Sequence, residues 1–196
     1  MHDIKLLLIG FVSGIVSYLL ACLGVVAFFL LPGTVYGLFL GFYYYHTKQV
    51  VPQRANNIFI FTAISTLAYV MAILGAAVIS NNFLDYISLN PEIYGEPIFS
   101  FIISGIIGAA ILLAGLHYFI KPLTLGQFIR LVLFGGALGL TWFVIPPGTI
   151  FPHSSYMSSP FEGIFGVLIF WQMGMTLAIE TITKNSTDGY FQKTSK

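Results

Sequence analysis

The chain is built from long apolar stretches that contain almost no charge. Only 8% of its 196 residues are charged and 57% are hydrophobic, whereas about 25% of the residues of a soluble domain are charged. Four stretches are close to the roughly 20 residues that a helix needs to cross a bilayer; they are 58–79, 98–119, 127–145 and 161–183. Because charge inside hydrocarbon costs free energy, this pattern predicts an all-α integral membrane protein.

The apolar region from Ile4 to Tyr45 is too long for one span. As a single helix it would measure about 60 Å, twice the hydrocarbon thickness. The segment Leu31–Thr34 reads Leu-Pro-Gly-Thr, and proline and glycine together end a helix and permit a reversal. We therefore expect spans at about 5–30 and 35–50, with one long broken helix as the alternative. The result is a single six-helix transmembrane domain with a short polar tail at 184–196.

The basic residues indicate how this bundle is oriented. In the six-span arrangement all eight fall on one side of the membrane: Lys5, Lys48, Arg54, Lys121, Arg130, Lys184, Lys193 and Lys196. The loops on the opposite side contain acidic residues and neither lysine nor arginine. The positive-inside rule then predicts that both termini are cytoplasmic, in a bacterial-type cytoplasmic membrane.

The Pro-Gly-Thr element of residues 32–34 occurs a second time at 147–149. Upstream of it, Leu23 and Gly24 align with Leu138 and Gly139. This similarity predicts that the first and last hairpins are duplicated in parallel, with glycines at positive φ in two external turns, Gly33 and Gly148. The competing interpretation is chance similarity between apolar segments that each carry a Pro-Gly turn.

Small residues recur at helical spacing and indicate close helix packing. They are Gly10, Gly14, Ser17, Ala21, Gly24, Gly33, Gly37, Gly41, Ser100, Ser104, Gly108, Gly135 and Gly139. Besides the lipid bilayer, the partners these faces suit are other membrane subunits or a second copy of the chain. A net charge of +1 provides no basic surface for nucleic acid.

The sequence contains no recognisable catalytic, cofactor or metal motif. The four histidines are scattered, and His117 has no second histidine at a suitable spacing for a metal or haem. The single cysteine, Cys22, lies in an apolar stretch and is interpreted as a packing residue. We therefore expect no metal and no cofactor.

The last span carries the most informative polar residues. Glu162, Thr176 and Glu180 fall on one helical face, with Gln172 beside it at mid-membrane depth. Lipid would not tolerate these groups, so we expect them to face the bundle or a water-filled cavity. Arg130 and His117 are the candidate cytoplasmic-side partners of Glu180. In the alternative interpretation the two glutamates simply reach water, and Glu180 pairs with Lys184 one turn later.

The segment Pro146–Pro160 is a long uncharged loop that is rich in hydroxyl groups. Its residues His153, Ser154, Ser155 and Tyr156 are candidates for an external lid over a cavity. An ordinary connector rich in turn residues is the competing interpretation.

In outline the chain is similar to the substrate-binding subunits of energy-coupling-factor transporters. The resemblance covers length, six helices, both termini inside and small residues on the first helix, and no site residue carries over from it. It implies a transporter or solute-binding membrane subunit. The alternatives are a structural or assembly subunit of a membrane complex and, third, an intramembrane enzyme, which the lack of a catalytic motif disfavours.

Overall fold

The computed structural model describes residues 4–21, 23–47, 57–79, 96–119, 123–143 and 167–181. All of these residues belong to helices or to short connections between them, which confirms the all-α bundle. In chain order the helices are α1 (Ile4–Ala21), α2 (Val25–Thr47), α3 (Asn57–Ile79), α5 (Glu96–Phe119), α6 (Leu125–Gly139) with the 3-10 turn η1 (Leu140–Phe143), and a C-terminal helix (Val167–Thr181).

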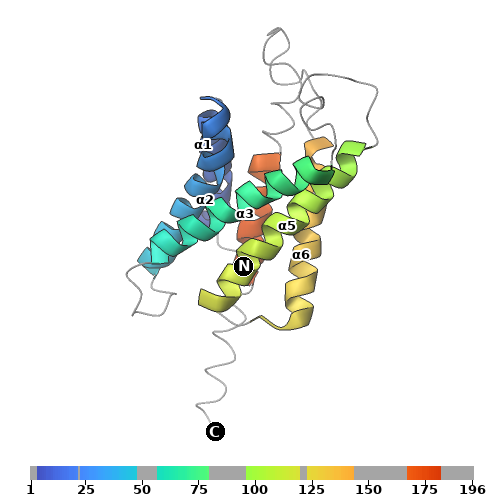
Figure 1. Cartoon of the computed structure of the whole chain (residues 1–196). Coiled ribbons are helices and arrows are strands. Elements are labelled where there is room, and N and C mark those ends of the chain that lie inside the picture. Colours follow the sequence, from blue (N-terminus) through green and yellow to red (C-terminus); the bar gives the residue numbers. More distant parts are fainter. Residues whose placement is uncertain are drawn as a thin grey trace.

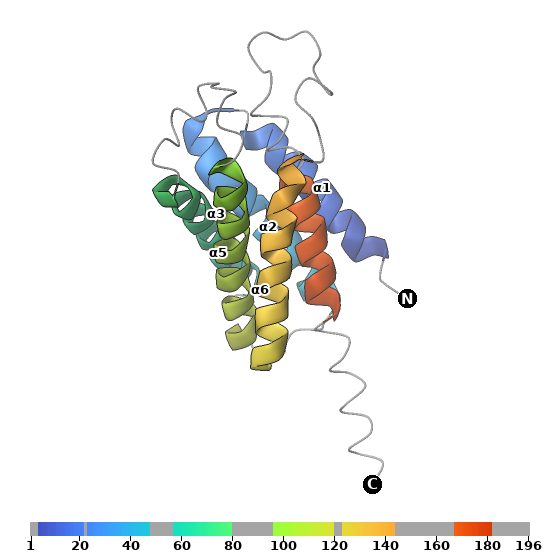
Figure 2. The same ribbon diagram turned by 90° about the vertical axis from the view of Figure 1, so that its right-hand side faces the viewer.

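Four of these helices, α1, α2, α3 and α5, are long and apolar enough to cross a membrane. The helix α6 and the C-terminal helix are apolar but shorter within the described residues. Consecutive helices run in alternating directions (Figures 1 and 2), and α1 packs on α2, α2 on α3, α3 on α5 and α5 on α6. The C-terminal helix lies between α1 and α6 and closes the bundle (Figure 2).

The reversal between the first two helices occurs earlier than the sequence predicted. The chain turns at Gly24, whose φ of 144° is a conformation that glycine adopts without steric cost. Pro32 instead lies inside α2. The predicted turn at 31–34 is therefore wrong, and in place of the expected helices at 5–30 and 35–50 the helices are Ile4–Ala21 and Val25–Thr47.

Two side-chain hydrogen bonds lie close to Pro32 in α2. A proline inside a transmembrane helix is tolerated where other groups satisfy the backbone that it disturbs. The Ser17 hydroxyl donates to the Pro32 carbonyl at 3.2 Å, and the Thr34 hydroxyl donates to the Leu30 carbonyl at 2.8 Å. The first bond joins the turn that contains Pro32 to α1, and the second lies within α2.

The proposed duplication of the two hairpins fails where it can be compared. Leu23 and Gly24 form a turn, whereas the aligned Leu138 and Gly139 are helical. Gly33 is helical as well, and the prediction of positive φ there is wrong. Gly148 and the second Pro-Gly-Thr element lie outside the described residues.

The glycine positions confirm that the helices pack closely. A Cβ atom on Gly33 would lie 2.6 Å from the Ser65 carbonyl oxygen, and one on Gly37 would lie 2.5 Å from the Thr62 Cα. Real Cβ atoms do not approach other heavy atoms so closely, so only glycine permits this contact between α2 and α3.

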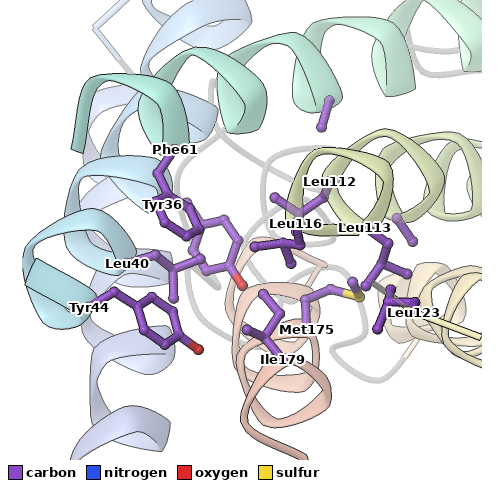
Figure 3. Packing of buried hydrophobic residues seen from close by; sticks show 12 residues of the cluster. Tyr36, Leu40, Tyr44, Phe61, Leu112, Leu113, Leu116, Leu123, Met175 and Ile179 are labelled. Carbon is purple, nitrogen blue, oxygen red and sulfur yellow. The ribbon is translucent and has the colours of Figure 1, made fainter. Parts of the chain in front are cut away.

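The hydrophobic core lies where α2, α5 and the C-terminal helix meet (Figure 3). Tyr36 and Tyr44 of α2 extend their hydroxyl groups toward the C-terminal helix, near Met175 and Ile179 (Figure 3). The core thus places polar atoms next to the helix that carries the predicted polar face.

Candidate functional site

The candidate site begins where α1 crosses the C-terminal helix at close range. A Cβ on Gly10 would lie 2.8 Å from the Met173 Cα, and one on Gly14 would lie 2.7 Å from the Ile169 Cα. Because the two backbones nearly touch, short polar side chains on α1 can reach groups on the C-terminal helix.

Gln172 is the centre of the buried polar network that results. Its side chain is only 2% exposed. Ser13 Oγ donates to Gln172 Oε1 at 2.7 Å, and Gln172 Nε2 donates to Ser17 Oγ at 3.1 Å. Ser17 Oγ in turn donates to the carbonyl of Pro32 in α2. Both ends of the amide are therefore satisfied inside the bundle, as a buried amide requires.

Thr176 extends this network to the core side of α2. Its hydroxyl donates to the carbonyl of Gln172 at 2.6 Å and lies 3.0 Å from the Tyr36 hydroxyl. Since the threonine proton is used on its own helix, the Tyr36 hydroxyl is the donor in the second bond. Tyr36 also packs edge-on against Trp171, with ring centroids 6.1 Å apart.

Glu180 follows one turn after Thr176 and is only 3% exposed. A carboxylate in this position is costly unless other groups compensate its charge. The C-terminal helix thus carries an amide, a hydroxyl and a carboxylate in succession, all buried, and hydrogen bonds join the first two to α1 and α2.

Of the four residues that the sequence assigned to the polar face of the last helix, three are buried: Gln172, Thr176 and Glu180. Glu162 lies outside the described residues, and so do the candidate lid residues His153, Ser154, Ser155 and Tyr156.

The predicted partners of Glu180 are both exposed. Arg130 is exposed on α6. His117 is exposed at the end of α5, where its Nδ1 accepts a hydrogen bond of 2.7 Å from the Leu123 backbone N–H. That bond fixes the connection into α6. A pair between Glu180 and either residue stays a prediction.

Ser13, Ser17 and Tyr36 are the network residues whose role the sequence did not reveal. Ser17 was interpreted as a small packing residue. A signal existed in the spacing of Ser13 and Ser17, which lie four residues apart on one face of an apolar helix. Hydroxyls on such a face need partners, but the sequence does not say which helix supplies them.

The chemistry available in the network is binding chemistry. It offers hydroxyl, amide and carboxylate groups that suit a polar solute or a cation. Within the described ranges no group of three His, Cys, Asp or Glu residues could hold a metal ion.

Comparison with protein-family models, with curated proteins and with solved structures found no match to this chain.

Proposed function

We propose that the chain is a small multi-pass membrane protein that binds or transports a polar solute. The observation that carries this proposal is the buried network of Gln172, Thr176 and Glu180 against α1 and α2. Polar and ionisable groups inside a membrane bundle are expensive, and they commonly mark the path or the site of a solute.

The outer surface of the bundle supports a location in a lipid bilayer. Large apolar side chains are exposed on every long helix, among them Leu8, Phe11, Leu19, Leu30, Phe42, Phe59, Leu67, Val78, Tyr118, Leu133 and Phe170. Hydrocarbon would cover them favourably. With α6 and the C-terminal helix as the fifth and sixth spans, the basic residues stay on one side. We therefore propose a cytoplasmic membrane with both termini cytoplasmic.

The network also favours one charge type of solute. Its only formal charge is the carboxylate of Glu180, and its other side chains are neutral hydroxyls and an amide. A neutral polar solute or a cation is therefore favoured over an anion, which the carboxylate would repel.

The alternative is a structural or assembly subunit of a membrane complex. One observation favours it: the oxygen and the nitrogen of the Gln172 amide each already make a hydrogen bond within the chain, as expected of a network whose role is to hold helices together. An intramembrane enzyme gains no specific observation from the described residues.

The proposal is tested with the purified chain and two matched variants, Thr176→Val and Thr66→Val. Each threonine donates to a carbonyl one turn earlier and contacts a hydroxyl on α2, but only Thr176 belongs to the network. A ligand stabilises the state that binds it. A solute from a panel of neutral polar compounds and cations should therefore raise the apparent Tm of wild type and Thr66→Val, but not of Thr176→Val.

Two results would contradict the proposal in favour of the assembly alternative. One is the lack of a Tm shift with every neutral or cationic solute, together with stable co-purification of other membrane proteins. The other is an equal shift in all three proteins, which would place binding away from the network.

A further inference from the structure

The contacts between α1 and the C-terminal helix define their register. Gly14 faces Ile169 and Gly10 faces Met173, so the residue number rises on one helix as it falls on the other. The two helices are therefore antiparallel, with Ser13 bonded to Gln172 at their crossing.

This register brings Lys5 to the level of Glu180. Lys5 lies eight residues before Ser13, and Glu180 lies eight residues after Gln172. Both displacements are about 12 Å along antiparallel axes, in the same direction. Figure 2 shows the start of α1 and the end of the C-terminal helix at the same end of the bundle. Long side chains such as lysine and glutamate can span the gap that opens between crossing helices.

Tyr44 lies at this end of the bundle as well. Ser17 bonds to Pro32, so the antiparallel pairing of α1 with α2 places Tyr44 at the level of Lys5. Tyr44 is fully buried, and its hydroxyl points toward the C-terminal helix near Ile179 (Figure 3). Ile179 directly precedes Glu180.

Of the described basic residues, Lys5 is the one whose level along the bundle is matched to Glu180 by the contacts of the C-terminal helix itself. The other described basic groups are Arg130, His46 and His117, which are all exposed, and His117 holds the Leu123 backbone N–H. Lys5 is exposed too, but its long stem lets the ammonium remain at the water boundary while it approaches a buried carboxylate.

We propose that Lys5 is the counter-ion of Glu180 and that these two residues, with Tyr44, close the cytoplasmic end of the polar network. The ion pair stands on the register alone. Its role as the inner gate of a solute path rests on the proposed function. Separating the pair would expose the network to cytoplasmic water.

A double-mutant cycle tests the pair on the full chain. Lys5→Gln and Glu180→Gln should each lower the apparent Tm by about 2–4 °C, the shift expected for about 1 kcal/mol at this length. The double variant should lose no more than the larger single loss, because one interaction is removed only once. Arg130→Gln and Lys184→Gln are the comparison partners, whose losses should add to that of Glu180→Gln. Additive losses for Lys5, or coupling to either comparison partner instead, would overturn the pair.

A second measurement needs no variant and so survives poor folding. A membrane-permeant carbodiimide joins a carboxylate to an amine only when the two are in contact. Mass spectrometry of treated wild-type protein should find an amide between Glu180 and Lys5. An amide between Glu180 and Lys184 in its place would contradict the proposal.

The gate is tested separately with Ser13→Cys in a Cys22→Ala background. Adding Lys5→Gln should speed thiol labelling of this cysteine from the cytoplasmic side. If the cycle shows coupling but labelling does not change, the gate is overturned and the ion pair stands. If labelling speeds up while no solute shifts the Tm, the gate stands and the proposed solute class fails.

Discussion

The interface between α2 and α3 and the interface between α1 and the C-terminal helix are built on the same packing and differ in their polar content. In both, glycines one turn apart bring two backbones into contact. At the first, Thr34 and Thr66 contact each other at 3.0 Å, and each also bonds to its own helix. At the second, the amide of Gln172 joins two serines of α1 and is itself fully buried.

The difference separates packing from a candidate site. Glycine spacing tells how closely two helices approach, and it does so equally at both interfaces. Only the second interface continues into a further hydroxyl and a buried carboxylate, Thr176 and Glu180. A helix contact needs no charge, so the carboxylate is the feature that packing leaves unexplained.

The largest effect is expected where the shared packing itself is broken. Gly14→Val and Gly37→Val should each destabilise the bundle by about 1–3 kcal/mol, because the added atoms meet backbone and force the helices apart. The apparent Tm measured in detergent should fall for both. Gly126→Ala is the control, since an added Cβ there meets nothing within 4 Å. A Gly14 variant as stable as this control would show that the two interfaces are not packed alike.

Replacing the Gln172 amide tests whether the polar groups between α1 and the C-terminal helix stabilise the bundle. Gln172→Leu should destabilise by about 1–2 kcal/mol, because Ser13 and Ser17 lose a buried partner and are left partly unsatisfied. Changing both serines to alanine in the same protein should restore part of the loss, since the hydroxyls that lost the amide are then gone; recovery is only partial because the bond from Ser17 to the Pro32 carbonyl is lost as well. Thermal unfolding of the single and triple variants measures this. A triple variant that is less stable than Gln172→Leu would mean that the serines stabilise the bundle without the amide.

The sequence alone predicts the helical fold and the presence of polar residues on one side of the C-terminal helix. Charge-free stretches predicted the helices, since hydrocarbon admits little else. The spacing of Gln172, Thr176 and Glu180 predicted a common bundle-facing side, and all three are buried. These are local properties of one helix.

The remaining features depend on contacts between helices that are distant in sequence. The turn was expected at Pro32 and lies at Gly24, whereas Pro32 lies inside α2 with its carbonyl bonded to Ser17 of α1. Likewise, the spacing of Ser13 and Ser17 on α1 could not identify Gln172, which lies 155 or more residues away, as their partner.

The smallest expected effect concerns Thr66 and Thr176, one threonine from each interface, which make similar contacts. Thr66→Val and Thr176→Val each remove one hydroxyl contact between helices, and such bonds in membranes average about 0.6 kcal/mol. The loss should be somewhat larger at Thr176, because the buried Tyr36 hydroxyl then lacks its acceptor, whereas Thr34 keeps its bond to Leu30. Chemical denaturation of both variants, with Tyr36→Phe combined with Thr176→Val as the control, measures the difference. The control should recover the extra loss, because no buried hydroxyl remains to be satisfied. Equal losses at both positions, with no recovery in the control, would show that the hydroxyls of the network stabilise the bundle no more than an ordinary helix contact. The distinction between the two interfaces would then depend on Gln172 and Glu180 alone.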